Sequence, residues 1–307
     1  METINMVHAV TAITVMPLYL ARDEGMFGKY GLNVNISYVQ SGSQPTATLL
    51  SGETQIFYGT GEGVTSKLAG ADVTYVTQLT KPTPWQMFSH KDVTNVEQLR
   101  GKKIGSPGGL GTSGRSALLF MLAKHGLTPN DVSIVQTGNG AQGLAALIAH
   151  GVDATMVASD VVEAQKQPDL HSLGVARDDG WQFVSGSGLV QRSYLASHRD
   201  ALVRFIQAQI EGAAEYHKNP DAAKKSFAQA ARLTDQSVID GNYESYLAEF
   251  LRVPAMNDQS VQAELDSLGD TVPNAKNAKP AQFYDNSLVS ELQSNGFIDK
   301  VWAGVTT

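Results

Sequence analysis

The stretch with the clearest chemical potential is Gly109-Leu110-Gly111-Thr112-Ser113-Gly114, which is followed at once by Arg115. It has the G-x-G-x-x-G spacing of a dinucleotide-binding turn and lies between an expected strand and an expected helix. Three interpretations stay open: a dinucleotide site, glycines that only allow a tight turn, or an exposed helix start that holds a small anion. A helix start offers unpaired backbone N–H groups and partial positive charge. Thr112 and Ser113 add hydroxyl donors, and the Arg115 guanidinium suits carboxylate, sulfonate or phosphate oxygens.

A second G-x-G-x-x-G, from Gly138 to Gly143, occupies the next expected turn from strand to helix. Two matches in neighbouring units indicate a general device for turning into a helix. A dinucleotide site also usually has an acidic residue at the end of the next strand, whereas this strand ends in Gln136-Thr137. The residues therefore favour a helix start that holds a small anion or polar group.

Several kinds of site have no support in the sequence. The chain has no cysteine, which removes disulfides, zinc–thiolate sites, iron–sulfur clusters and cysteine nucleophiles. Its seven histidines show no H-E-x-x-H motif and no paired metal spacing, and neither G-x-S-x-G nor a Walker motif occurs. We therefore expect no catalytic residue, no metal and no cofactor. His8 is the histidine that ends an expected strand, where it would face a cleft.

The balance of charged residues restricts which kinds of molecule the protein can bind over a large surface. There are 23 Lys and Arg residues against 30 Asp and Glu, a net charge of −7, which argues against nucleic acid and anionic lipid as partners. No stretch reaches the ~18 uninterrupted apolar residues of a membrane helix. The N-terminus lacks the basic flank and apolar run of a signal peptide. Composition thus leaves two locations open: the cytoplasm, or another compartment if the chain is a mature form with a new Met1.

Short β-type runs alternate with helical runs over the first 190 residues, which predicts mostly parallel sheets covered by helices. Two breaks interrupt the pattern, at Lys81-Pro82-Thr83-Pro84 and at Ser185-Gly186-Ser187-Gly188. From Tyr194 onward the pattern is almost wholly helical. We predict two α/β lobes: residues 1–84 with the mostly helical 189–307 form the first, and residues 85–188 form the second.

Four blocks of the sequence resemble solute-binding proteins of the nitrate/sulfonate/taurine type, which are related to the thiamine-pyrimidine-precursor binding proteins. The blocks are MPLYLARDEGMFGKYGLNV at 16–34, ATLLSGETQI at 47–56, NVEQLRGKKIG at 95–105 and AALIAHGVDA at 145–154. Gln55 departs from the pattern, because an Asp often stands at this position in the family.

The resemblance implies a type II periplasmic-binding-protein fold: two α/β lobes joined by a two-strand hinge, with the ligand in the interlobe cleft. It implies the substrate-binding component of an ABC importer, a monomer that delivers its ligand to a membrane permease. It further implies a periplasmic location with the signal peptide removed, or an extracellular, membrane-anchored one. Related enzymes work through cysteine, which this chain lacks. Two rivals stay open: a cysteine-free lyase or decarboxylase using His8 and Arg115, and a nicotinamide-dependent oxidoreductase.

Ligands of parallel α/β sheets lie beyond the carboxyl ends of the strands, where loops lead into helix starts. This rule nominates polar or aromatic residues from both lobes: Thr11, Thr14, Ser43, Gln44, Thr60, Glu62, Trp85, Thr112, Ser113, Arg115, Asn139, Gln142 and Asp160. Donors dominate, which suits a small organic anion or polar aromatic: a sulfonate, a carboxylate or a pyrimidine-like compound. Glu62 and Asp160 argue the other way, and we expect them to face an amine or ring nitrogen.

Overall fold

The computed structural model describes residues 1–39, 44–109, 112–158 and 161–305, and the chain divides into two compact units. Unit 1 comprises Met1–Lys81, Ser185–Asp258 and Lys279–Thr307, and unit 2 comprises Pro82–Val184 and Gln259–Ala278. The sequence prediction assigns residues 259–278 to the first lobe, whereas in the structure they pack within unit 2. The chain therefore passes from one unit to the other at four points.

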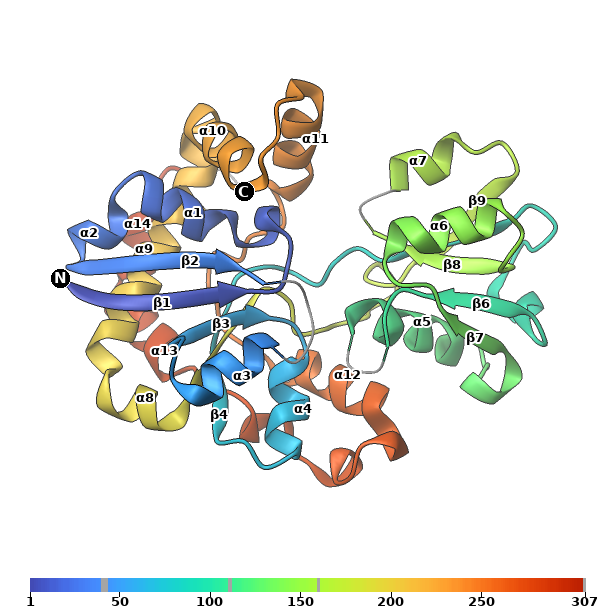
Figure 1. Cartoon of the computed structure of the whole chain (residues 1–307), viewed down its shortest axis with the longest axis horizontal. Coiled ribbons are helices and arrows are strands. Elements are labelled where there is room, and N and C mark those ends of the chain that lie inside the picture. Colours follow the sequence, from blue (N-terminus) through green and yellow to red (C-terminus); the bar gives the residue numbers. More distant parts are fainter. Residues whose placement is uncertain (40–43, 110–111, 159–160, 306–307) are drawn as a thin grey trace. The chain divides into compact units, whose positions relative to one another are not determined.

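The sheet of unit 1 has five strands in the order β2-β1-β3-β10-β4. Figure 1 shows β2, β1 and β3 side by side. They are β1 (Glu2–His8), β2 (Leu32–Tyr38), β3 (Ile56–Gly59), β4 (Val73–Gln78) and β10 (Ser187–Gln191). β1 is parallel to β2 and β3, while β10 runs antiparallel to both of its neighbours. The expectation of a break at 185–188 is wrong for Ser187 and Gly188, which begin β10 and are buried.

The sheet of unit 2 also has five strands, in the order β7-β6-β8-β5-β9. They are β5 (Gln86–His90), β6 (Lys103–Ser106), β7 (Ser133–Gln136), β8 (Ala154–Val157) and β9 (Leu170–Val175). β6 is parallel to β7 and β8, and β5 is antiparallel to β8 and β9. Each unit thus holds one mixed sheet with a single reversed strand beside the middle strand, which confirms the predicted α/β class.

Helices cover both sheets. Those of unit 1 are α1 (Met16–Asp23), α2 (Met26–Lys29), α3 (Gln44–Ser51), α4 (Glu62–Leu68), α8 (Arg192–Ser197), α9 (Arg199–Lys218), α10 (Pro220–Ala231), α11 (Gln236–Tyr246), α13 (Ser287–Ser294) and α14 (Phe297–Val301). Unit 2 has α5 (Ser113–Lys124), α6 (Gly140–Ile148), α7 (Val161–Lys166) and nearly all of α12 (Asp258–Leu268). Among the described residues, no helix has both the length and the apolar character that crossing a membrane requires.

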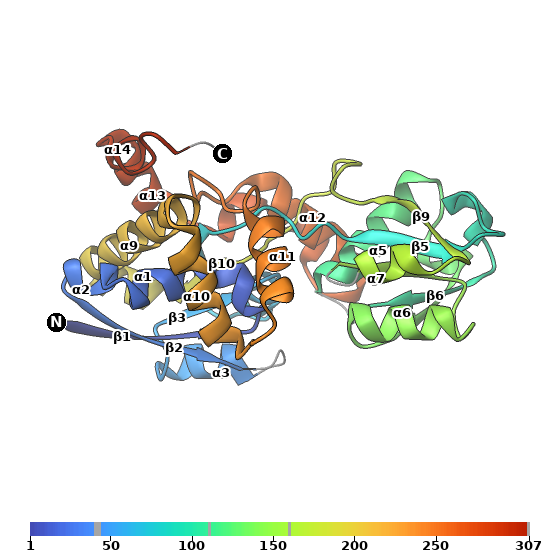
Figure 2. The ribbon, with the colours of Figure 1, turned by 90° about the horizontal axis from the view of Figure 1, so that it is seen from above.

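The longest helix, α9, is built into the core of unit 1. Its sequence places Leu202, Phe205 and Ile206 on one buried face. α1 packs against this helix (Figure 2), and the two approach most closely at Gly212. A β-carbon added to Gly212 would lie 2.1 Å from the backbone oxygen of Pro17. The small residue therefore sets how close the two helices lie.

A buried glutamine of α9 joins this helix to the sheet. The Gln209 side chain accepts a hydrogen bond from the Tyr58 hydroxyl on β3 and donates one to Thr77 Oγ1 on β4, at 2.8 Å. Gly188 of β10 pairs with both Tyr58 and Thr77, and a β-carbon there would lie 2.8 Å from the Thr77 methyl group. The missing side chain in β10 leaves room for the groups that bind Gln209.

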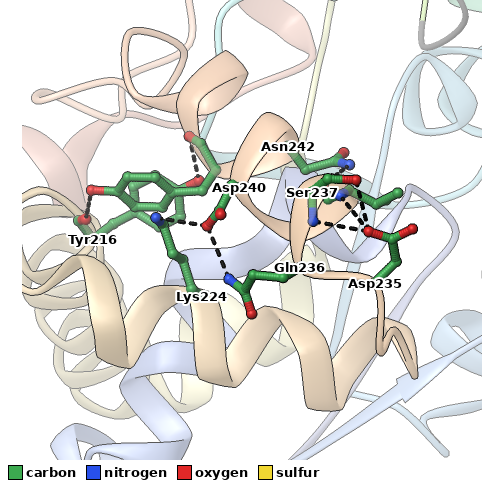
Figure 3. Close-up of polar contacts among 9 residues, drawn as sticks. Tyr216, Lys224, Asp235, Gln236, Ser237, Asp240 and Asn242 are labelled. Carbon is green, nitrogen blue, oxygen red and sulfur yellow. Dashed lines mark hydrogen bonds and ion pairs between the residues drawn. The ribbon is translucent and has the colours of Figure 1, made fainter.

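The helices α10 and α11 are held together by polar contacts (Figure 3). Lys224 pairs with Asp240 at 2.8 Å, and this hydrogen bond holds the pKa of the Asp240 carboxyl below its usual value. The Lys224 ammonium also lies 5.1 Å from the centre of the Tyr243 ring. Tyr216 of α9 donates to the Tyr243 carbonyl at 2.9 Å, and Tyr243 donates back to the Tyr216 carbonyl at 3.1 Å. Asp235 caps the first turn of α11 by accepting from the Ser237 N–H at 2.9 Å. These contacts fix the position of α11.

At the carboxyl end of β1, His8 is buried and its two ring nitrogens are both hydrogen-bonded. Nδ1 lies 2.8 Å from the Val10 carbonyl, which can only accept, so this nitrogen carries the proton. Nε2 therefore accepts from the Tyr19 hydroxyl, at 2.8 Å. Burial lowers the pKa of His8. The imidazole is neutral and serves to join β1 to α1.

We predict opposite effects of alanine at two helical glycines of unit 1. Gly212→Ala should destabilise the protein by about 1–3 kcal/mol, because the methyl group has no room beside Pro17. Gly241→Ala, in α11, should stabilise it by about 0.5–1 kcal/mol, because nothing lies within 4 Å of the added methyl and alanine favours helix. Urea unfolding measures both. Equal free energies of unfolding for the two variants would show that α1 and α9 are not held at contact distance.

We also predict that acid weakens the fold through His8. Its folded-state pKa lies below the unfolded value of 6.5, so the unfolded chain binds the proton first as the pH falls. Stability should be full above pH ~6.5 and decline below it, by at most about 1.4 kcal/mol per pH unit for one proton. His8→Asn should reduce this slope between pH 7.5 and 5.5, measured by urea unfolding. His217, whose pKa burial also lowers, contributes separately, so His217→Asn is the companion variant. An unchanged slope in His8→Asn would contradict the assignment.

Candidate functional site

The nominated residues lie in loops and first helical turns beyond the carboxyl ends of parallel strands, as the sequence predicts, with Trp85 just before β5 as the exception. For the described residues, these loops follow β1, β2 and β3 in unit 1 and β6 and β7 in unit 2. Ser43 and Asp160 lie outside the described residues.

In unit 2, Thr112 precedes α5 as its N-cap residue but does not cap it. Its hydroxyl donates to the Gly109 carbonyl at 2.8 Å and lies 3.2 Å from the Pro107 carbonyl. The hydroxyl hydrogen that the sequence suggests for a ligand is therefore used within the loop. Since the Thr112 side chain does not cap this helix start, the backbone N–H groups of the first turn have no side-chain acceptor among the described residues.

Trp85 packs on this helix start. Its indole N–H donates to Ser113 Oγ at 3.1 Å. A β-carbon added to Gly114 would lie 3.1 Å from the Trp85 ring and 2.5 Å from Pro107 Cγ. The last glycine of the first G-x-G-x-x-G thus allows the helix to pack against Trp85 and Pro107. This explains the glycine without a dinucleotide.

Arg115 follows in the first turn of α5 and is partly buried. Its Nε is inaccessible to solvent and has no hydrogen-bond partner among the described residues. By contrast, Lys124 at the other end of α5 pairs with Asp179 at 2.7 Å. The guanidinium therefore has donor capacity that the described part of the chain does not use.

Asn139 and Gln142 cap the start of α6. The Gln142 N–H donates to the Asn139 side chain at 2.9 Å, and the Asn139 N–H donates to the Gln142 side chain at 3.0 Å. Gly138 has a φ of +93°, and a β-carbon there would collide with the Gln142 side chain. The second G-x-G-x-x-G is accounted for by this capping box, which leaves the amide nitrogens of the exposed pair for other contacts.

In unit 1, Thr11 and Thr14 lie at the two ends of one short turn. Their hydroxyl oxygens are 3.0 Å apart, and Thr14 Oγ1 lies 3.3 Å from the hydroxyl of Tyr246. Thr11 is exposed and Thr14 is buried. Because Tyr246 ends α11, the contacts of that helix also position this turn.

Glu62 folds back on its own loop. Its Oε2 accepts from the Thr60 N–H at 2.6 Å and from the Thr60 hydroxyl at 3.2 Å. Tyr75 supports the same loop by accepting from the Gly63 N–H at 2.8 Å and donating to the Thr60 carbonyl. The Glu62 carboxylate is thus partly satisfied internally, which reduces its conflict with an anionic ligand. Gln44 begins α3 and is exposed.

Two aromatic residues at this edge of unit 1 are not among the sequence candidates. Tyr246 lies 232 residues from Thr14, so no local pattern connects them. Tyr38 ends β2, is 59% exposed, and has its ring 5.3 Å from that of His8. An aromatic residue at the end of a predicted strand was the available signal for Tyr38. Among the described residues, no group of three His, Asp or Glu side chains is arranged to hold a metal ion.

The chain is similar in sequence or in structure to several known proteins. Riboflavin-binding protein RibY from Chloroflexus aurantiacus is 26% identical over 240 residues, or 74% of this chain, and the match spans less than two thirds of RibY, at 66%. The structure of the periplasmic aliphatic sulphonate binding protein SsuA from Escherichia coli matches with a TM-score of 0.67 at 16% identity, covering 100% of this chain and 92% of SsuA. The structure of the desulfurization enzyme DSZB matches with a TM-score of 0.64 at 15% identity, covering 96% and 99%.

The structural matches confirm the predicted type II periplasmic-binding-protein fold, with one mixed five-stranded sheet in each lobe. They include both binding proteins and an enzyme, so the fold alone does not assign an activity. A family model described as NMT1/THI5 like matches residues 12–223. This match covers more than half of the sequence and confirms the family resemblance carried by the four sequence blocks. The chain belongs to the NMT1/THI5-like family.

Proposed function

We propose that this chain is the substrate-binding component of an ABC-type importer and that it captures a small organic anion or polar aromatic compound. The observation that carries the proposal is the Arg115 guanidinium, partly buried and unpartnered among the described residues, in the first turn of an uncapped helix. A buried donor without a partner costs free energy, which a ligand oxygen would recover. The importer role is supported by the family and by binding proteins of the same fold.

Three features of unit 2 support an acceptor-rich ligand group. The guanidinium supplies a positive charge with planar donors, the start of α5 supplies free N–H groups, and Ser113 supplies a hydroxyl. A charge-assisted hydrogen bond of this kind contributes about 1.5–3 kcal/mol. Sulfonate and carboxylate groups both fit this donor set.

Both units contribute ligand-binding residues in this proposal. From unit 1 they are Thr11, Thr14, Ser43, Gln44, Thr60 and Glu62, and from unit 2 they are Trp85, Thr112, Ser113, Arg115, Asn139, Gln142 and Asp160. The protein acts without metal or cofactor, as a monomer outside the cytoplasmic membrane, and its partner is the membrane permease of the importer. SsuA, which shares the fold, is described as periplasmic.

The lyase or decarboxylase alternative gains nothing from His8. Both ring nitrogens are occupied by Val10 and Tyr19, and burial keeps the ring neutral. A general base needs a nitrogen that reaches the substrate proton. DSZB shares the fold, and a turnover assay distinguishes the two roles.

We predict a saturable rise in melting temperature with one class of a panel of alkanesulfonates, carboxylates, pyrimidines and riboflavin, and a dissociation constant of about 1 μM, or about −8 kcal/mol, by calorimetry. The bound compound should be recovered unchanged after prolonged incubation. Formation of a product by the purified chain would overturn the binding role. Stabilisation by NAD alone would favour an oxidoreductase.

We further predict that Arg115→Ala weakens the identified ligand about tenfold to a hundredfold, because it removes a charge-assisted contact worth about 1.5–3 kcal/mol. Arg115→Lys should recover part of the loss, since it keeps the charge without the planar fork. The melting temperature without ligand should change little. Lys124→Ala, on the same helix, is the matched control and should leave the affinity unchanged. Unchanged affinity in Arg115→Ala would make Arg115 a surface residue.

A further inference from the structure

We propose that Trp85 is a positioning residue that fixes Ser113 as a hydrogen-bond donor to the ligand. The indole N–H occupies one lone pair of Ser113 Oγ, so the hydroxyl hydrogen of the serine is directed elsewhere, toward an acceptor oxygen. This inference rests on the proposed binding function and deepens it, because it states which chemical group the helix start selects.

The direction of the contact follows from the atoms involved. An indole nitrogen can only donate, so Ser113 Oγ must be the acceptor of the 3.1 Å contact. A serine hydroxyl has one hydrogen, which this contact leaves unused. Among the described residues, no acceptor is hydrogen-bonded to it. Ser113 therefore retains a donor whose oxygen is already held in place.

The backbone of Trp85 is anchored on both sides. Its backbone N–H donates to the Thr83 carbonyl at 2.8 Å, and its carbonyl accepts from the Ala176 N–H at 2.9 Å. The indole ring lies against the helix start at Gly114, where an added β-carbon would be 3.1 Å from the ring. An anchored backbone and a ring packed on the helix start restrict the orientations open to Ser113, so less side-chain entropy is lost when a ligand binds.

Accepting one hydrogen bond also strengthens the bond that the same hydroxyl donates. With one of its two lone pairs occupied by Trp85 and its hydrogen free, Ser113 favours a ligand group that accepts, such as a sulfonate or carboxylate oxygen, over an ammonium group. Arg115 lies two residues further on and imposes the same preference through its charge. The two residues together select the acidic end of a ligand.

Another serine of the same helix accepts from a second tryptophan, and this matched pair has a different expected role. Trp181 Nε1 donates to Ser116 Oγ at 3.3 Å, and both residues are almost fully buried, with 0% and 3% exposure. Ser116 lies one turn further into α5 and belongs to the core of unit 2. Loss of the Trp181 N–H should therefore affect stability and leave ligand affinity unchanged.

Calorimetry with ethanesulfonate as the probe tests the inference. Ser113→Ala should weaken binding about tenfold, and Trp85→Phe, which keeps a ring but removes the N–H, about three- to tenfold. The double variant should bind no more weakly than Ser113→Ala alone, because Trp85 acts through the serine. Trp181→Phe should lower the melting temperature without changing the affinity. Losses that multiply in the double variant, or an unchanged affinity in Trp85→Phe, would overturn the proposal.

A second readout reports on the serine directly. The chain has three tryptophans, so their indole N–H resonances can be assigned by replacing each in turn. Ser113→Ala should move the Trp85 resonance, and ethanesulfonate should move it in the native protein but not in Ser113→Ala. If the native protein binds only uncharged compounds of the ligand panel, the importer role stands and this inference fails. If it binds no compound of the panel, both fail.

Discussion

The interaction on which unit 1 depends is the contact of Gln209 with Tyr58 and Thr77. The buried side-chain amide of Gln209, on α9, forms hydrogen bonds with both strands that flank the reversed strand β10. A buried amide without these partners would cost about 1–3 kcal/mol. The contact therefore requires β10 to lie between β3 and β4, and requires glycine at position 188. The same contact therefore links the strand order of the sheet to the position of α9, and α9 in turn positions α1, which packs on it.

The candidate site shows how a loop can be rich in polar residues and still offer few groups to a ligand. Some of these residues form hydrogen bonds within their own loops, namely Thr112, Thr60 and Glu62. In the capping box of α6, the side chains of Asn139 and Gln142 each accept from the backbone N–H of the other. These residues give the loops a fixed shape. Arg115 and Ser113 differ, since each keeps a donor that no described residue accepts. In the candidate site, most polar side chains thus form hydrogen bonds within the protein and fix the shape of the loops, and a few keep donors that a ligand could use.

The sequence predicts most of what local chemistry determines. The alternation of strands and helices over the first 190 residues and the helical character of the chain after Tyr194 are both confirmed. The antiparallel strand β10 is not predicted, because it begins with Ser187 and Gly188, which have low strand propensity and read as a break. Its strand conformation is imposed by partners far away in the sequence. The same holds for residues 259–278, whose place in unit 2 no local pattern indicates.

For the candidate site too, local features follow from the sequence, whereas contacts between distant residues do not. The position of Arg115 after a glycine-rich turn predicts a cation at a helix start, and the structure confirms that place. The capping box of Asn139 and Gln142 is not predicted, although both residues lie within one turn. The contacts of Trp85 with Ser113 and of Thr14 with Tyr246 join residues 28 and 232 positions apart. Nothing within either segment indicates its partner, because these pairs are created by the packing of whole elements.

The division of the chain between the units has a consequence for synthesis. Residues 259–278 belong to unit 2, and unit 1 is completed only by residues from Lys279 onward, including the Phe283–Asp285 segment that bonds to Tyr75 at the edge of β4. Neither unit can reach its full set of contacts before residues 259–285 have left the ribosome. The early segments of both units therefore wait for partners that are made after them, and the two units acquire their last contacts close together in time.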